Sequence, residues 1–408
     1  MRFVTSPHDF DLKLTIAVDL LSMAAEKQLQ LFGLYVSQGA PYGFQANVLP
    51  ILFRDWGKSY NSNGLLYLSY LPWVMKPLAA PFLEKSNLSS VSKTLIISAI
   101  TQIMIAYAVM QKSSNSLIIL YLISNTFTAL YDILVDKLAI QQRSESEIDT
   151  ANVFQVVGYK IGSLLSGSFI QLLVIQYFSA DFRALVLSPL VASVTFLIMA
   201  IWSNRSYHLS ESSKLLHEAA NSHQPDQSTL AAEKPHRAAY SMIWKHFCKH
   251  SAIYALLFTY KAGEQIGDSL FKTFLRDSGF NVAALSGSAL LNDAVSIAGS
   301  LVMVGRAKKD RGSRGDINQL RWFLLLNIIP QCLRALVVWN KSAQEFVLVT
   351  AITIVENFIG GAVTVACFNF MFSHVLPDIE GTHYAVYASL EALGKIIVGA
   401  SANFAVER

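Results

Sequence analysis

Long apolar segments separated by short polar ones dominate this chain. Uncharged runs such as residues 28–53, 94–111 and 184–204 are each long enough to cross a bilayer, because about 20 helical residues span a hydrocarbon core of roughly 30 Å. The pattern predicts an all-α integral membrane protein. Eleven spans are expected, at residues 31–53, 63–83, 94–111, 117–138, 151–177, 184–204, 252–275, 283–304, 322–339, 345–374 and 383–405.

Three stretches of the first half recur in the second half, displaced by about 224 to 232 residues. A duplicated array of hydrophobic helices with ionisable residues at matched depths is typical of secondary transporters. The repeat therefore predicts two pseudo-symmetric helical bundles. The matched pairs are Leu34–Gly39 with Thr259–Glu264, Tyr131–Asp132 with Val355–Glu356, and Gly162-x4-Gly167 with Gly394-x4-Gly399.

The predicted domain organisation follows from the repeat. A cytoplasmic N-terminal segment (1–30) precedes a six-helix bundle (31–204), a polar cytoplasmic linker (205–250) and a five-helix bundle (251–408). The linker composition is typical of a flexible segment. Arg408 maps back to about position 176, so a matching twelfth helix is missing. Two interpretations stay open: a truncated chain, or a protein with eleven spans and an external C-terminus.

Composition supports the membrane assignment and sets limits on chemistry. Apolar residues make up 53% of the chain and charged residues 15%, against about 25% charged in soluble domains. The three cysteines, Cys248, Cys332 and Cys367, have no metal-ligand or disulfide spacing. The first 27 residues lack an uninterrupted apolar core, so we expect no cleavable signal peptide, and the first span to direct insertion.

The distribution of Lys and Arg predicts the orientation. Loops after odd-numbered spans carry few of them, whereas basic residues concentrate in the loops after even-numbered spans. The positive-inside rule then places the even loops, the linker and the N-terminus in the cytoplasm. The basic residues of the even loops are Lys85, Lys93, Arg143, Arg205, Lys214, Lys234, Arg237, Lys245, Lys249, Arg306, Lys308, Lys309, Arg311 and Arg314.

Asp132 and Asp136 lie four residues apart and so project from one face of the fourth span. A charge at the bilayer centre costs roughly 2.5 to 3.5 kcal/mol, so such residues should face a partner or a hydrated cavity. Two nearby carboxylates repel and favour holding a proton, which predicts a proton-coupling site. The alternative is a structural pair neutralised by Lys160, or Asp136 at the interface beside Lys137.

The second half carries a similar set of ionisable residues within its predicted spans. Lys261, Glu264 and Asp268 form one stripe on the seventh span. Lys261 and Glu264 are expected either to form an internal ion pair, or to act on the solute, with Lys261 facing an anion and Glu264 changing partner between the two states of the cavity. Glu356, beside Asn357, occupies the repeat position of Asp132. It is expected to face the cavity or to pack against Arg334.

Intramembrane cations favour an anionic or strongly polar solute. Lys76 in the second span and Lys160 in the fifth are the candidates in the first half, although both could instead extend toward the headgroups. For Asp293, Arg334, Glu391 and Lys395, salt bridges between helices are the alternative to a role in the cavity. Close packing between helices is predicted at the small residues Gly158, Gly162, Gly167, Gly360, Gly361, Gly394 and Gly399.

Other signals are weak. His246, Cys248 and His250 could bind a metal, but no fourth ligand is evident, and a solvated interfacial helix is the favoured interpretation. Asn340 begins a glycosylation sequon close to the membrane. The sequence has no Gly-rich phosphate loop, nucleophile elbow or zinc-protease motif. We therefore expect no enzyme, no cofactor and no metal site.

Six short motifs carry a resemblance to a known family. They are Gly33–Gly43, Pro72-Trp73-x2-Lys76, Asp132–Asp136, Gly158–Gly167, Tyr260–Glu264 and Glu356–Gly361. In this order they resemble the AmpG-like permease and acetyl-coenzyme A transporter branch of the major facilitator superfamily. The resemblance implies two bundles around a central cavity, alternating access, and a muropeptide sugar or acetyl-coenzyme A as cargo. The motifs add Tyr35, Gln38 and Tyr260 to the candidate substrate and coupling residues.

The expected function is that of a secondary transporter for a small polar, anionic solute, with proton coupling as a hypothesis. A receptor or scaffold that kept the fold without transport is the alternative. Expected partners are a small-molecule solute, protons and the lipid bilayer, with no nucleic acid, and a monomeric state is expected. The sequence leaves the plasma membrane and the endoplasmic reticulum open as locations.

Overall fold

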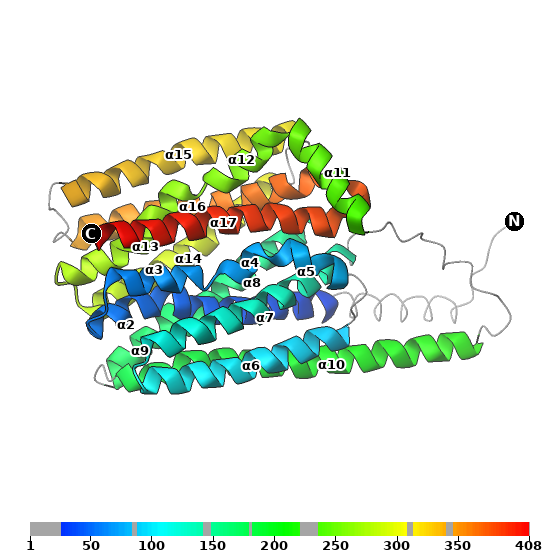
Figure 1. Cartoon of the computed structure of the whole chain (residues 1–408), viewed down its shortest axis with the longest axis horizontal. Helices are drawn as coiled ribbons and strands as arrows, with labels where there is room; N and C mark the ends of the chain where they lie inside the picture. Colours follow the sequence, from blue (N-terminus) through cyan, green and yellow to red (C-terminus); the bar gives the residue numbers. More distant parts are fainter. Residues whose placement is uncertain are drawn as a thin grey trace, which may run out of the picture.

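The computed structural model of the chain describes residues 26–83, 88–141, 148–178, 182–220, 236–307, 313–339 and 346–407. Within these ranges the regular structure is helical. Most helices lie nearly parallel to the long axis of the molecule, with first-half helices (blue to green) packed beside second-half helices (yellow to red) (Figure 1). Long helices that pack side by side satisfy their own backbone hydrogen bonds, as a bilayer requires.

The first half consists of six helical rods, three of them interrupted. A helix over residues 26–43 continues through a π-helical turn into α2, and α8 continues through a second π-helical turn into α9. The bounds are Phe44–Val48 (π turn), α2 Leu49–Asp55, α3 Tyr60–Leu68, α4 Leu71–Val74, α5 Lys76–Leu83, α6 Leu88–Met110, α7 Ser114–Gln141, α8 Ile148–Leu164, Leu165–Phe169 (π turn), α9 Ile170–Tyr177, Phe182–Val186 (3₁₀ turn) and α10 Leu187–Ala220.

The second half begins with α11, which lies across one end of the bundle (Figure 1). Five rods follow, and a 3₁₀ turn precedes the last. The bounds are α11 His236–Lys249, α12 Ser251–Thr259, α13 Ala262–Asp277, α14 Val282–Ala307, α15 Ser313–Trp339, α16 Phe346–Ser373, Pro377–Ile379 (3₁₀ turn) and α17 Glu380–Val406.

The all-helical membrane class is confirmed. Among the described residues, eight helices are long and apolar enough to cross a membrane. Helical rods also coincide with the predicted spans 31–53, 63–83 and 252–275, but these are interrupted, so the count of eleven stays a prediction. Residues 1–25, the middle of the predicted linker (221–235) and the sequon at Asn340 lie outside the described residues.

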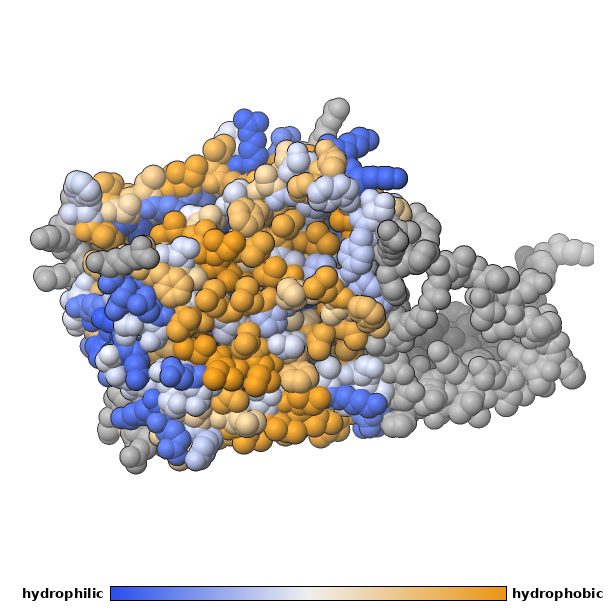
Figure 2. All heavy atoms as spheres, viewed as in Figure 1, coloured by the Kyte–Doolittle hydropathy of each residue, from blue (hydrophilic) through white to orange (hydrophobic). Residues whose placement is uncertain are grey.

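The surface agrees with a bilayer environment. Apolar side chains cover the middle of the molecule, and hydrophilic ones gather toward its ends (Figure 2). Large apolar side chains point outward along whole helices, among them Ile201 and Leu336, which are 71% and 54% exposed. In water such continuous apolar surface would be a liability. Against lipid tails it is the expected covering.

Two of the interruptions in the helical rods have a lysine beside them. Pro72 lies in the first turn of α4, and the helix breaks again at Met75 before Lys76 opens α5. The seventh rod breaks at Tyr260 and Lys261, between α12 and α13. Within a membrane, irregular backbone is tolerated only where it is buried in protein or lines a water-filled cavity. Both breaks turn a lysine toward the interior.

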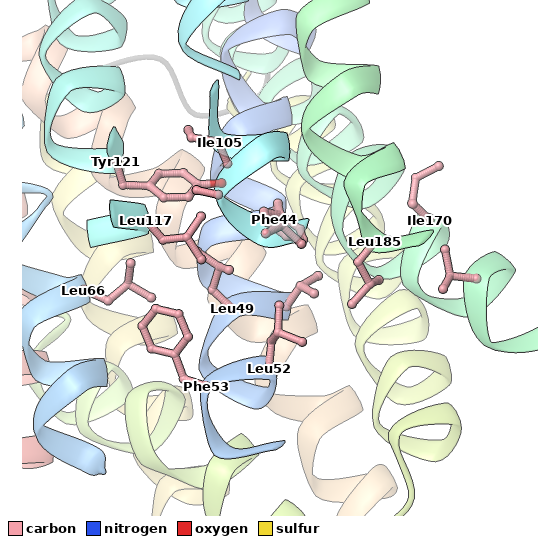
Figure 3. Packing of buried hydrophobic residues seen from close by; sticks show 14 residues of the cluster. Phe44, Leu49, Leu52, Phe53, Leu66, Ile105, Leu117, Tyr121, Ile170 and Leu185 are labelled. Carbon is pink, nitrogen blue, oxygen red and sulfur yellow. The ribbon is translucent and has the colours of Figure 1, made fainter. Parts of the chain in front are cut away.

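Buried apolar clusters lie in both halves of the molecule. In the first half, Phe44 and Leu49 of the first rod pack with Leu66 of α3, Ile105 of α6 and Tyr121 of α7 (Figure 3). These side chains are nearly inaccessible, with exposed fractions of 0–2%. Lipid tails are as apolar as leucine, so close van der Waals packing, rather than escape from water, stabilises such a core.

Glycines bring helix backbones into direct contact. A Cβ atom at Gly162 of α8 would overlap the carbonyl oxygen of Val36, and one at Gly394 of α17 would overlap that of Phe258. The two contacts join the first and fifth rods of each half, as the repeat predicts. Of the other predicted packing glycines, Gly158, Gly167, Gly361 and Gly399 also lie in tight contacts, and Gly360 faces Glu264.

Replacement of Gly162 by Ala tests this packing. The added methyl group must displace the backbone of Val36 or Ala40, so we expect a loss of about 1–3 kcal/mol and a lower thermal midpoint of the detergent-solubilised protein. Gly287→Ala is the matched control, because nothing lies within 4 Å of its Cβ position in α14. It should leave the midpoint unchanged or raise it. Equal midpoints for the two variants would contradict the packing role.

Candidate functional site

A central cavity of about 410 Å³ lies between the two halves and takes its lining from both. Equal numbers of cationic and anionic side chains line it, so a simple count of charges does not favour an anion. The lining cations are Lys76, Lys160, Lys261, Lys272, Arg334 and Lys395, and the lining carboxylates are Asp132, Asp136, Glu264, Asp268, Asp293 and Glu391. Which of these have ionic partners decides what the cavity can bind.

Asp132 is the centre of the first-half cluster. Its carboxylate accepts hydrogen bonds from the Lys76 ammonium and the Gln38 amide, and Lys76 also lies 4.5 Å from the Trp73 ring centre. Lys76 is buried, so it does not extend to the headgroups. The partner of Asp132 is therefore Lys76 rather than Lys160.

Asp136 lies one turn further along α7 and also lines the cavity. It accepts hydrogen bonds from the Tyr35 hydroxyl at 3.0 Å and the Gln155 amide at 3.2 Å. Tyr35 itself is buried and lies outside the cavity lining. The two aspartates share a face, as predicted, but they are held by different partners.

Arg334 of α15 is the centre of the second-half cluster. Its guanidinium group donates to Glu356 and, at 3.4 Å, to Asp268. Glu356 also accepts a hydrogen bond from Gln331 at 2.5 Å and lies outside the cavity lining. The geometry corresponds to the structural alternative for Glu356, packing against Arg334. Its neighbour Asn357 lines the cavity.

Lys261 and Glu264 form the internal pair that their spacing predicts, with 4.0 Å between Nζ and Oε1. Lys261 also donates to the Thr364 hydroxyl at 2.9 Å, and Asn327 donates to Glu264 at 3.2 Å. Both charged groups line the cavity. The neighbouring Tyr260 is part of the apolar cluster of the second half and does not line the cavity.

A third polar cluster crosses from one half to the other. Asp293 of α14 accepts hydrogen bonds from Ser168 at 3.1 Å and Asn47 at 3.5 Å, both in the first half. Asn47 in turn accepts a hydrogen bond from Lys272 of α13 at 2.6 Å. Lys160 of α8 donates to the Ser296 hydroxyl, one turn beyond Asp293.

Aromatic rings line part of the cavity wall that the first half of the chain contributes. Tyr42 lies with its ring centre 5.3 Å from that of Tyr159 and 5.9 Å from that of Tyr70. Tyr67 continues the group, 6.3 Å from Tyr70, and all four line the cavity. Aromatic faces bind apolar or planar parts of a ligand. The cavity can therefore hold a solute with a ring or an acyl chain as well as polar groups.

The same four-residue motif ends the first rod of each half. Arg54-Asp55-Trp56-Gly57 recurs as Arg276-Asp277-Ser278-Gly279, 222 positions later. In both copies the glycine has a positive φ, 71° and 95°, and its N–H donates to the carbonyl of the arginine. The next residue donates to the carbonyl five positions earlier. This is a Schellman helix ending, which favours glycine at that position because of its positive φ.

The two motifs bind each other reciprocally at the end of the molecule predicted to face outward. Arg54 pairs with Asp277 at 3.0 Å, and Arg276 pairs with Asp55 at 2.7 Å. Tyr60 adds a hydroxyl bond to Asp277 at 2.6 Å, and its N–H donates to Glu407 after α17. We call these contacts the outer clamp. They join the first rods of the two halves directly.

Sequence reasoning did not find the outer clamp, Lys272 or Asn47. The clamp had a signal, because Arg-Asp-x-Gly recurs at nearly the same displacement as the other repeats. Lys272 is one turn beyond Asp268 on the same stripe of α13, so the predicted stripe could have been extended to it. Asn47 gave no signal, because its role depends on the π-helical turn that carries it.

The segment with His246, Cys248 and His250 forms α11 at the opposite end. A ring nitrogen of His246 shares a hydrogen bond with Tyr254 at 3.0 Å, and Cys248 is exposed. Burial, followed by the nearby His250, lowers the pKa of His246. Within the described ranges no group of three or more potential ligands is close enough to hold a metal.

With this fold and cavity, the chain matches the Major Facilitator Superfamily over residues 31–399. It therefore belongs to that superfamily of multi-pass membrane transporters, and is not assigned to an enzyme class. An uncharacterized protein of Haemophilus influenzae is 21% identical over 91% of this chain and 86% of its own length.

Two solved structures show the same fold. The nucleoside transporter NupG has 14% identity and a TM-score of 0.61, over 93% of this chain and 91% of its own. The E. coli xylose transporter XylE, in a partially occluded inward-open conformation, has 12% identity and a TM-score of 0.60, over 93% and 89%. These similarities support the fold and leave the AmpG-like branch a prediction.

The Lys76–Asp132 pair can be tested by removing each partner and then both. Lys76→Gln or Asp132→Asn leaves one buried charge uncompensated, and we expect a loss of about 3–5 kcal/mol from each. The double variant should recover most of it. The measurement is the thermal midpoint in detergent, with exposed Lys249→Gln as control. If the double variant is as unstable as the worse single one, the pair is not a compensating unit.

The outer clamp predicts a closed mouth on that side. Asp277→Asn should weaken closure by about 1 kcal/mol, so a cysteine placed at Ala46 in the cavity should react about fivefold faster with a membrane-impermeant maleimide added from the Arg54 side. Asp55→Asn should act in the same direction. A chain without its native cysteines is the background, and Lys112→Gln is the control. Unchanged rates in both aspartate variants would show that other contacts close this end.

Proposed function

We propose that this protein is a secondary transporter that moves a small polar, anionic organic solute by alternating access. The observation that carries the proposal is the charged cavity itself. It is enclosed in a membrane-spanning fold of the superfamily, and its lining comes from both halves. Charged side chains at this depth are costly unless they face a hydrated path or a partner. In a solute site between two bundles, some of these charged side chains face the hydrated path and others form ion pairs.

The lining residues suggest the class of solute. Lysines from both halves, Lys160 and Lys272 among them, offer ammonium groups to a carboxylate or phosphate. The tyrosine wall offers rings to an apolar or planar portion. A volume of about 410 Å³ lies within the roughly 300–1,000 Å³ range of pockets that bury small organic ligands. Acetyl-coenzyme A is the named candidate, on the resemblance of the sequence motifs alone.

Proton coupling is the second part of the proposal. A carboxylate couples transport to protons when its protonation changes with the state of the cavity. Asp132 and Glu356 are held in buried ion pairs with Lys76 and Arg334, so each already has a counter-charge within its own half. Glu264 has a longer ionic contact with Lys261. Cavity carboxylates with longer ionic contacts, such as Glu264, are therefore the better candidates for proton coupling.

Flux measurements in proteoliposomes test the proposal. The purified full chain should exchange labelled acetyl-coenzyme A or adenosine monophosphate faster than protein-free liposomes. Replacing Lys261 by Gln should lower the rate about tenfold, because the ammonium group contributes about 1.4 kcal/mol or more to binding an anion. Lys249→Gln, an exposed position outside the cavity, is the matched control.

The alternatives give different results in the same experiment. Exchange of neutral adenosine with no exchange of the anionic solutes would contradict the anionic class. Binding of a solute to the purified protein without flux of any of the three would favour the receptor or scaffold. An acid-inside gradient that leaves the uptake rate unchanged would remove proton coupling from the proposal.

A further inference from the structure

Three charged side chains around the cavity have uncharged hydrogen-bond partners. The Lys272 ammonium donates to the Asn47 carbonyl oxygen at 2.6 Å, and the Lys160 ammonium to the Ser296 hydroxyl. The Asp293 carboxylate accepts from Ser168 and Asn47. Within the part of the chain that the structure describes, no opposite charge lies within ion-pair distance of these three groups.

Most of the other charged side chains that line the cavity form ion pairs. Lys76 holds Asp132, Arg334 holds Asp268 and Glu356, and Lys395 holds Glu391 at 2.8 Å. Such pairs are already compensated and gain little from a further ion. Lys160, Lys272 and Asp293, in contrast, compensate one another only at a distance, and all three line the same cavity.

The three groups come from different elements that meet at the boundary between the halves. Lys160 is on α8 of the first half, Lys272 on α13 and Asp293 on α14 of the second. Asn47 connects Lys272 to Asp293, and Ser296, the partner of Lys160, lies three residues from Asp293 on one helix face. The charged groups that act on Asp293 electrostatically include Lys272, Lys160 and Asp268. Asp268 is already engaged by Arg334, and α16 contributes Glu356, which is also engaged.

We propose that Lys160, Lys272 and Asp293 form a switchable anion site, which binds a carboxylate or phosphate group of the solute when Asp293 takes up a proton. This inference rests on the proposed transport function and specifies its site. With Asp293 charged, the three groups carry a net charge of +1. A proton from the adjoining water neutralises the carboxylate and leaves +2, without moving any helix. The anion then takes the place of Asp293 as the counter-charge of the two lysines.

The charge on the Asp293 carboxylate couples the binding of the proton to the binding of the anion. A carboxylate between two ammonium groups repels an incoming anion, and its protonation removes that repulsion. By linkage, the factor by which a proton raises anion affinity equals the factor by which the anion raises proton affinity. Both ligands should therefore bind together and leave together, which is the thermodynamic requirement for cotransport. Because the site contacts both halves, its occupation also changes the contacts between them.

Sulfate binding to the purified full chain in detergent tests the site. Sulfate keeps its charge across the range used, so any pH dependence belongs to the protein. We expect the wild-type protein to bind sulfate at least tenfold more tightly at about pH 5 than at about pH 8, measured by thermal shift in chloride-free buffer. Sulfate added at an intermediate pH should also cause uptake of up to about one proton per chain.

Variants separate the parts of the site. Asp293→Asn should bind sulfate at both pH values as tightly as the wild type does in acid, and should take up no proton. Asp293→Glu should retain the pH dependence. Lys160→Gln and Lys272→Gln should each weaken binding at least tenfold at both pH values. Glu380→Gln and Lys249→Gln, which change exposed charges outside the cavity, are the matched controls and should behave as the wild type.

Each outcome decides the inference. Absence of sulfate binding to the wild type in acid, or a full pH dependence in a folded Asp293→Asn variant, would overturn it. The proposed function is judged separately by flux. Solute exchange that is insensitive to Asp293→Asn would remove the switch and keep the transporter. A pH-switched sulfate site without flux of any solute would keep the switch and remove the transporter.

Discussion

The cost of placing charge inside a bilayer governs the arrangement of this protein. An ionisable side chain at that depth needs a partner or water, and neither is available on the lipid-facing surface. The structure meets this requirement by turning its intramembrane charges toward one cavity between the halves, where six cations and six carboxylates line a common space. Two helix breaks lie beside such charges, because Lys76 and Lys261 each follow an interruption of their rod and line the cavity.

The charges serve two different purposes within that cavity. Lys76 with Asp132 and Arg334 with Glu356 are tight buried pairs that fix helices to one another within each half. Lys160, Lys272 and Asp293 are held by neutral groups across the boundary between the halves. The first kind joins helices within one half, and the second joins the two halves through uncharged groups. The proposed movement of one bundle against the other requires the second kind of contact to rearrange.

Sequence patterns predicted the fold and several of the residues that line the cavity. Apolar length identified the rods, and the repeat identified the two halves, because both depend on local composition and spacing. The cost of charge inside a bilayer pointed to Asp132, Lys261 and Glu264, and the motif resemblance pointed to Gln38; all four line the cavity. The spacing within one helix predicted the Lys261–Glu264 pair, but partners on different helices stayed open. Asp132 pairs with Lys76 rather than Lys160, and Glu356 pairs with Arg334 outside the cavity lining, because helix rotation and tertiary packing decide which side chains meet. The interruptions of the rods likewise depend on neighbours that local hydropathy does not describe.

The outer clamp has a consequence for the origin of the two halves. Arg54 contacts Asp277 and Asp55 contacts Arg276, so each motif offers the other the same two groups in exchange. Such reciprocity is the property of an isologous interface, in which identical surfaces meet across a two-fold axis. A single half carrying Arg-Asp-x-Gly could therefore have closed against an identical copy of itself before the halves were joined. The symmetry of the contact is incomplete, because Tyr60 binds Asp277 and the described residues contain no equivalent hydroxyl bond to Asp55.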